Sequence, residues 1–94
     1  MTNDEFEWDD AKAARNFRDH GVTFEAACEV FRDLFALDWP DTSEDYGEDR
    51  FATIGMVRDR LLYVAYTMRG ERIRIISARG ADPHEKRQYH EEND

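Results

Sequence analysis

The sequence predicts an α+β domain in which two N-terminal helices and one C-terminal helix flank a small antiparallel sheet. Apolar residues recur at helical spacing from Phe24 to Phe31, a pattern typical of a helix with one buried face. Apolar and polar residues then alternate through several short segments between residues 50 and 79, as in half-buried strands. A helix start with proline in its first turn follows at Asp82. Helices that are segregated from a run of consecutive strands indicate the α+β class.

The elements follow in the order β-α-α-β-β-β-β-α. Phe6-Glu7-Trp8 alternates as a short strand, and Asp9 is placed to cap a helix from residue 10 to 20 that Gly21 ends. Thr23 is placed to cap the second helix. The strands are expected at 34–39, 50–57, 60–68 and 71–79, with an acidic loop at 41–49 before the second of them.

The last two strands are predicted to form a hairpin with a two-residue turn at Arg69-Gly70. This register pairs Tyr66 with Ile73 and Val64 with Ile75 on an apolar face. Arg72 and Arg74 then project together from the opposite face. The final helix begins with Asp82 as N-cap, Pro83 at its first position and Glu85 completing a capping box. Core packing is expected for three aromatic residues: Trp8, Phe17 and Phe24.

The length and composition predict one domain spanning residues 1–94, with a short tail at 91–94. Of the 94 residues 37% are charged and 13% aromatic, which favours a folded chain over a disordered one. The lone Cys28 cannot form an internal disulfide, as in proteins of reducing compartments. No signal peptide and no apolar run of membrane-spanning length is visible. We therefore expect a cytoplasmic protein with no membrane partner.

The net charge of −9 is distributed unevenly along the chain. Residues 1–49 hold 4 basic and 15 acidic side chains, a net charge of −11, whereas residues 50–90 hold 9 basic and 4 acidic ones, a net charge of +5. The basic C-terminal half favours binding of phosphates or of an acidic partner. The negative total charge alone would argue against such binding.

Motifs for cofactors and metals are missing from the sequence. There is no glycine-rich phosphate loop, no G-x-S-x-G and no pair of cysteines at zinc spacing. The acidic loop does not follow the EF-hand pattern because Gly47 is misplaced. His84 and His90 are six residues apart and would not share a helical face. We expect neither a metal nor a cofactor.

Two features carry candidate chemistry. The first is a set of arginines, because guanidinium groups bind phosphates bidentately and stabilise the charge of a phosphoryl transition state. Arginines that alternate along a strand are equally typical of an ordinary solvated face. The second is His20, which could transfer a proton near neutral pH or simply cap the C-terminus of its helix. The arginines of the set are Arg50, Arg69, Arg72, Arg74 and Arg79.

Several segments resemble the BrnT family in the same order along nearly the whole chain. The N-terminal match is F-E-W-D, Lys12, Asn16 and H-G-V-T-F-E from His20. The central match is V-F-R-D from Val30, an acidic loop, Arg50-Phe51 and Ile54-Gly55. The C-terminal match is T-M-R-G from Thr67, I-R-I-I-S-A-R from Ile73, and E-K-R-Q-Y from Glu85. Two positions depart from the family pattern: Asp19 and Gly80 stand where the family usually has lysine.

The resemblance implies the toxin of a bacterial type II toxin–antitoxin pair, with a fold similar to RelE-type ribonucleases. It implies that the chain cleaves RNA, arrests translation and is neutralised by a BrnA-like antitoxin. The chain would bind DNA only indirectly, through that antitoxin. On this basis we expect a metal-independent endoribonuclease. Arg72, Arg74 and Arg79 would hold the phosphate, and His20 or Lys12 would transfer protons or position the RNA. Further RNA contacts would come from Arg50, Arg69, Lys86 and Arg87.

Two other readings remain open. In the first, the basic sheet docks a partner protein, and Asp19 and Gly80 mark a weakened or lost nuclease. In the second, the chain regulates DNA directly, although no recognition helix stands out because the first helix mixes basic and acidic residues.

Overall fold

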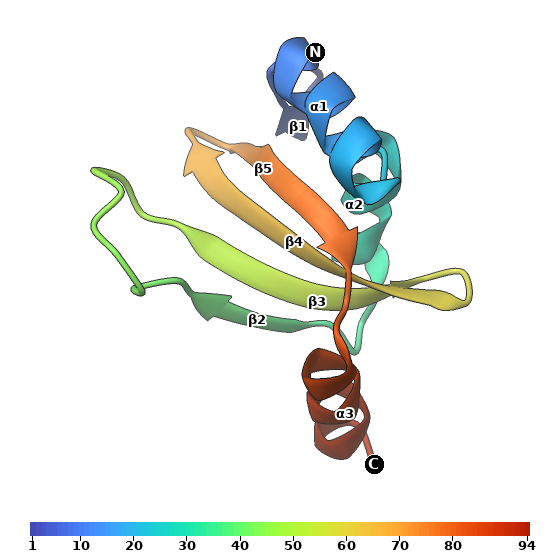
Figure 1. The fold of residues 1–94 in the computed structure, drawn as a ribbon. Coiled ribbons are helices and arrows are strands. Elements are labelled where there is room, and N and C mark those ends of the chain that lie inside the picture. Colours follow the sequence, from blue (N-terminus) through green and yellow to red (C-terminus); the bar gives the residue numbers. More distant parts are fainter.

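The computed structural model describes all residues from 1 to 94 and confirms the predicted order of helices and strands (Figure 1). The structure also contains a short 3₁₀ helix after the second helix, which the sequence did not predict. Such tighter turns are common at the ends of α-helices. The elements are β1 (Phe6–Glu7), α1 (Asp10–His20), α2 (Phe24–Glu29), η1 (Val30–Arg32), β2 (Leu37–Pro40), β3 (Phe51–Val57), β4 (Arg60–Arg69), β5 (Arg72–Gly80) and α3 (Pro83–Glu92).

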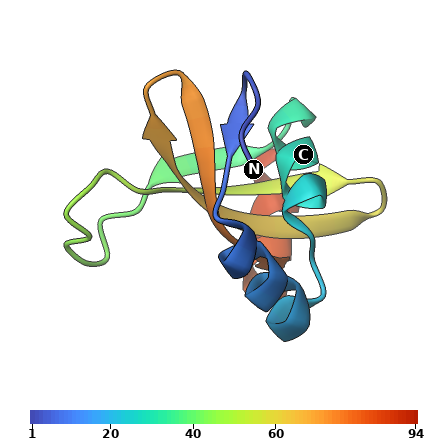
Figure 2. The same ribbon diagram turned by 90° about the horizontal axis from the view of Figure 1, so that it is seen from above.

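The five strands form one mixed sheet in the order β1-β5-β4-β3-β2. Strands β2 to β5 pair in antiparallel fashion, as the sequence predicted, but β1 pairs with β5 in parallel, which the sequence did not predict and which makes the sheet mixed. The reason is the long path between the two strands: β1 leads into both helices and three further strands before β5 returns beside it (Figure 2). A parallel pair requires such a long connection, whereas a hairpin does not.

The predicted caps of the helices are confirmed. Asp9 accepts hydrogen bonds from the backbone N–H groups of Ala11 and Lys12, and Gly21 ends α1 in the left-handed conformation. Thr23 Oγ1 accepts from Ala26 N at the start of α2. The full capping box of Asp82 and Glu85 starts α3. These local patterns fix the helix ends because each satisfies backbone donors that have no partner inside the helix.

The predicted register of the last hairpin was wrong by two residues. Arg69 pairs with Arg72, so the turn consists of Gly70 and Glu71, and Tyr66 lies opposite Ile75 instead of Ile73. Gly70 has φ 61°, and a glycine at the first loop position is typical of a two-residue turn of this kind. The first of the four main strands, expected at 34–39, begins only at Leu37 because Asp33 and Ala36 close a turn before it.

A β-bulge in β5 changes which side chains share a face of the sheet. Ser77 pairs with Ala65 and Ile75 with Tyr66, which leaves Ile76 as the extra residue of β5. Side chains alternate between faces in a regular strand, so Arg74 and Arg79 would lie on opposite faces without the bulge. With it, Arg79 lies opposite Tyr63 and Arg74 opposite Thr67, on the same face as Arg72.

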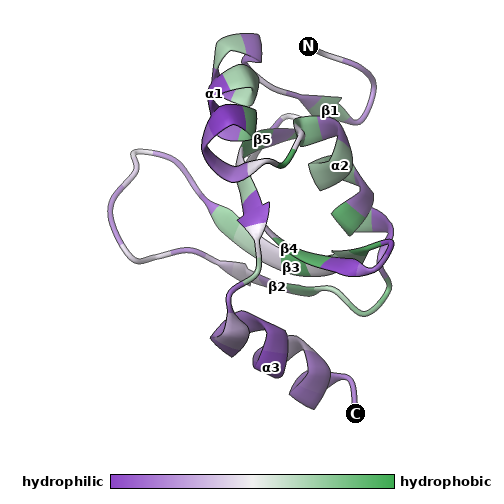
Figure 3. Ribbon diagram, turned by 45° about the vertical axis from the view of Figure 1, so that its right-hand side comes forward, coloured by the Kyte–Doolittle hydropathy of each residue, from purple (hydrophilic) through white to green (hydrophobic).

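The helices cover the two faces of the sheet unequally. Helices α1 and α2 pack on one face around a core that includes Trp8, Phe24 and Val64, while α3 lies beneath the opposite face and buries Tyr89 against Ile54 (Figures 1 and 3). Trp8 and Phe24 are buried as predicted. Phe17 is not, because it lies on the outer side of α1 with 54% of its surface exposed. No helix of the chain is long and apolar enough to cross a membrane.

Candidate functional site

The arginines of β5 lie in one row on the face of the sheet that α3 only partly covers. Arg72, Arg74 and Arg79 lie opposite Arg69, Thr67 and Tyr63 of β4, which share one face of the sheet. A strand rises about 3.3 Å per residue, so the Cα atoms of Arg72 and Arg79 are roughly 20 Å apart. The three side chains therefore cannot converge on a single phosphate group. Each would have to contact a different part of a bound polymer.

Arg74 occupies the middle of this row and is held by an ion pair. Its guanidinium contacts a carboxylate oxygen of Glu7 at 2.6 Å, across the parallel pair of β1 and β5. Both side chains are largely shielded from solvent, which strengthens the attraction. Asp9 lies nearby: hydrogen bonds from the Lys12 and Ala11 backbone, and the charges of Lys12 and Arg74, lower the pKa of its carboxyl group.

Arg79 is bound to the start of α3. Its guanidinium donates to both carboxylate oxygens of Glu85, at 2.8 and 2.9 Å, and to the carbonyl of Gly80 at 3.1 Å. It also lies over the Tyr63 ring, 4.2 Å from the centroid. The hydrogen bonds and charge of Glu85 raise the pKa of Arg79. Since Glu85 is also part of the α3 capping box, Arg79 fastens this helix to the sheet.

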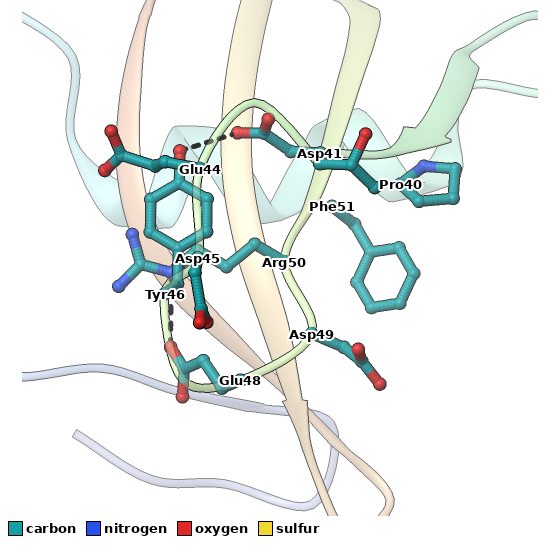
Figure 4. Close-up of a pocket in the computed structure, with 10 residues that line it drawn as sticks. Pro40, Asp41, Glu44, Asp45, Tyr46, Glu48, Asp49, Arg50 and Phe51 are labelled. Carbon is teal, nitrogen blue, oxygen red and sulfur yellow. Dashed lines mark hydrogen bonds and ion pairs between the residues drawn. The ribbon is translucent and has the colours of Figure 1, made fainter.

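Arg50 directly precedes β3, whose first residue, Phe51, pairs with Tyr66 of β4. Its guanidinium lies over the ring of Tyr46, 4.2 Å from the centroid, and its Nε contacts Glu48 at 3.2 Å (Figure 4). Glu48 also reaches Arg69 at 3.9 Å. The acidic loop at 41–49 thus folds back on Arg50, and its remaining carboxylates surround a hollow of about 580 Å³ beside it.

The remaining candidates occupy three different places. Arg72 donates from Nε to the carbonyl of Asn3 at 2.7 Å and pairs with no carboxylate. Lys86 lies beside a hollow between α3 and the β3–β4 turn, while Arg87 lies on another side of α3. Neither residue of α3 lines the same hollow as any arginine of β5.

A second hollow, of about 370 Å³, opens between α1 and the bulge of β5. It brings together three predicted site residues: Lys12 and His20 from α1, and Arg50 from the segment that precedes β3. Ile76 is its one apolar lining residue, which shows that the bulge forms part of its wall. The other residues that line it are Arg15, Asn16 and Asp19.

Asn16 holds α1 in place beside this hollow. Its side-chain amide donates to the carbonyls of Ala78 and Val22, at 2.8 and 3.0 Å, and its oxygen accepts from the N–H of Ala78 at 3.1 Å. The amide thereby binds backbone groups at the outer edge of β5, beyond the point where β1 ends and no strand pairs with them. This buried contact fixes the height and rotation of α1 against the sheet, and with them the positions of Lys12 and His20.

The comparison with known proteins gives the family. The profile described as "Ribonuclease toxin, BrnT, of type II toxin-antitoxin system" matches residues 8–85. The chain belongs to the BrnT toxin family. None of the curated proteins that were compared with it matches. The BrnT match includes α1, the hollow beside it and all the arginines of β5.

The two departures from the BrnT pattern have different surroundings. Asp19 lines the hollow beside α1, and its carboxylate contacts Arg18 at 3.5 Å. At Gly80 a Cβ atom would lie 2.9 Å from the guanidinium of Arg60. Arg60 therefore places a positive charge beside the backbone position where the family usually has lysine. The loss of positive charge at Gly80 is therefore smaller than the sequence indicated.

Arg15 lines the hollow but is not among the site residues predicted from the sequence. Arg15 follows Lys12 by three positions on a helix, and residues at this spacing share one face. That periodicity was a usable signal for placing Arg15 with Lys12. The arrangement offers exposed cationic groups that bind phosphate oxygens, and an exposed imidazole that can transfer a proton.

Proposed function

We propose that this BrnT family member is a metal-independent endoribonuclease that inhibits translation and is neutralised by an antitoxin resembling BrnA. The family assignment supports a ribonuclease toxin of a type II system. The observation that carries the finer proposal is the hollow where Lys12, His20 and Arg50 meet, with Arg74 beside Thr67 in the same region of the sheet.

In the proposed reaction, the 2′-hydroxyl of a nucleotide attacks the adjacent phosphorus. A new P–O2′ bond forms, the P–O5′ bond breaks, and the products are a 2′,3′-cyclic phosphate and a free 5′-hydroxyl. Arg74, Arg50 and Lys12 stabilise the added negative charge on the phosphate, which is commonly the largest contribution to such catalysis. His20 transfers the proton between the attacking and leaving oxygens.

The other basic residues have supporting roles in this proposal. Arg69 and Arg72 extend the positive surface toward the β4–β5 turn and contact flanking phosphates. Lys86 and Arg87 contact a more distant part of the RNA or the ribosome. Arg79, which the sequence placed among the catalytic groups, holds α3 and is the candidate whose guanidinium is most completely occupied.

The direct test is cleavage of a single-stranded RNA by the purified chain in the presence of EDTA. We expect fragments that end in a cyclic phosphate, and no fragments from the same RNA with 2′-O-methyl groups throughout. Cleavage that requires added Mg²⁺ would contradict the metal-independent mechanism. Products with a 5′-phosphate would contradict attack by the 2′-hydroxyl.

The biological part of the proposal is tested by induced expression in a bacterial host with and without the neighbouring gene. We expect growth arrest, loss of RNA and a fall in protein synthesis, all relieved by co-expression of a neighbouring antitoxin. Binding to operator DNA is expected only for the complex with the antitoxin. Arrest that the neighbour does not relieve would separate the chain from a toxin–antitoxin pair.

A second candidate function is a catalytically weakened module that binds a partner protein. Its support is that four of the predicted arginines already contact carboxylates of this chain, namely those of Glu7, Glu48 and Glu85. A bound RNA would have to compete with these carboxylates. Soluble chain that binds its neighbour's product tightly but never cleaves RNA would favour this function.

A further inference from the structure

We infer that the hollow between α1 and the β5 bulge is a phosphate-binding subsite for RNA, and that Arg15 is a principal phosphate ligand in it. This inference rests on the proposed function and adds to it a binding residue outside the arginines of the sheet. Arg15 is not among the site residues that the sequence indicated, and it lies on α1 instead of on the sheet.

The availability of charge distinguishes this hollow from the arginine row. In the row, Arg74 and Arg79 each contact a glutamate at 2.8 Å or less. Lys12 and Arg15 take part in no ion pair and no side-chain hydrogen bond, and both are exposed. A phosphate can therefore bind Lys12 and Arg15 without displacing a carboxylate of the protein, which it must do at Arg74.

The helix that carries these two cations is anchored to the sheet. Lys12 and Arg15 lie about one helical turn apart on the face of α1 that lines the hollow, and the neighbouring Asn16 is fastened to the backbone of β5. Side chains on a helix that is fixed in this way are better placed for recognition than side chains on a loop. Arg50, held over Tyr46, completes the opposite wall.

The lining favours a phosphate of RNA over a segment of a partner protein. Of the 7 lining residues only Ile76 is hydrophobic, whereas protein interfaces are usually centred on buried apolar or aromatic side chains. Asp19 is the one acid in the hollow, and its carboxylate contacts Arg18 on the adjacent part of α1. The hollow also shares Lys12, His20 and Arg50 with the proposed cleavage site, so a strand bound here continues into that site.

The test compares two arginines of the same helix. Arg15→Gln removes a charge from the hollow, while Arg18→Gln removes an exposed charge of the same helix that does not line the hollow and contacts Asp19. Binding is measured with a fluorescent single-stranded RNA that carries 2′-O-methyl groups throughout, so that cleavage cannot interfere. Titrations at several salt concentrations give the dependence of log K on log[salt], and thermal melts check that both variants are folded.

We expect Arg15→Gln to weaken binding by about tenfold, the typical effect of losing a charged hydrogen bond. The salt slope should fall by about 0.7, the value for one phosphate contact on a single strand. Arg18→Gln should change affinity by less than about twofold, because an exposed charge outside the site acts only through screened long-range attraction. Arg15→Lys should keep the salt slope, since it keeps the charge.

Three results would overturn the inference. Equal RNA binding by the Arg15→Gln and Arg18→Gln variants would overturn the role of Arg15. It would leave the proposed function intact, because the wild-type chain would still bind RNA. A loss of antitoxin binding in Arg15→Gln with unchanged RNA binding would reassign the hollow to a protein partner. A wild-type chain that neither binds nor cleaves RNA would overturn the proposed function as well.

Discussion

The arginine row of β5 and the face of α1 that carries Lys12 and Arg15 are both positively charged, but glutamates of the protein neutralise two of the three arginines of the row. In the row, Arg74 contacts Glu7 at 2.6 Å and Arg79 contacts Glu85 at 2.8 Å. On α1, Lys12 and Arg15 have no such partner. The half of the chain with a net charge of +5 thus holds arginines that are locally neutralised, such as Arg74 and Arg79, while the half with −11 contributes two unpaired cations.

The glutamates that pair with the predicted arginines come from distant parts of the sequence. Glu7 lies on β1, Glu48 in the acidic loop and Glu85 on α3. Charge counted along a sequence therefore does not measure the charge that a ligand meets, because pairing in three dimensions decides which groups remain available. Changes that alter one region and not the other test this difference.

The largest effect is expected from Arg74→Ala, which removes the central cation of the row. Cleavage should fall by about 10²–10³-fold, the usual effect of losing one preorganised group that stabilises transition-state charge. The measurement is the single-turnover rate on a short RNA, with a thermal melt to check folding. Glu7→Gln is the matched control, since it breaks the same ion pair but keeps the arginine. A wild-type rate in Arg74→Ala would remove Arg74 from the mechanism.

The next effect concerns stability. Arg79→Ala should lower the free energy of unfolding by about 1–3 kcal/mol, because Glu85 loses its bidentate partner and the start of α3 loosens. Urea denaturation measures this change. Arg87→Ala, an exposed change on the same helix, should stay within about 0.5 kcal/mol of wild type. If Arg79→Ala is stable but does not cleave RNA, then Arg79 belongs with the catalytic residues as the sequence suggested.

A smaller effect is expected from Glu48→Gln, which frees Arg50 and Arg69. RNA affinity should rise about two- to fivefold, since exposed ion pairs of this kind are weak. Glu44→Gln removes a charge from the same loop but contacts neither arginine, and it should raise affinity less. Equal gains in the two variants would show that only the total charge of the loop matters.

The smallest effect is a loss of stability in acid that originates at Asp33. Burial raises the pKa of this carboxyl group, but hydrogen bonds from Met56 N, Phe35 N and the Tyr89 hydroxyl together lower the pKa below its ordinary value of 3.8. A lowered pKa in the folded state means that the carboxylate stabilises the fold above about pH 4 and ceases to do so as the pH falls through the folded value.

Asp33→Asn should remove this part of the pH dependence. We expect the difference in unfolding free energy between wild type and variant to be constant at neutral pH and to shrink below about pH 4. Urea titrations at pH 7, 5 and 3.5 measure it. A difference that is the same at all three values would show that the charge of Asp33 does not stabilise the attachment of α3.

The sequence by itself determined the local structure. Asp9, Gly21, Thr23 and the Asp82–Glu85 capping box set the ends of the helices because their partners are backbone groups within a few residues. The order of elements, the α+β class and the BrnT family were also predictable, since each depends on patterns along the chain.

Only the tertiary structure decided the pairing of distant groups. The parallel partner of β1, the two-residue shift of the last hairpin and the bulge at Ile76 depend on how strands twist and pack against α1 and α3. These features in turn decide that Arg79 shares a face with Arg74, that Phe17 is exposed, and that Arg15 faces the hollow. The physical reason is that ion pairs and shared faces are interactions between segments far apart in sequence, whereas caps and helical periodicity are local.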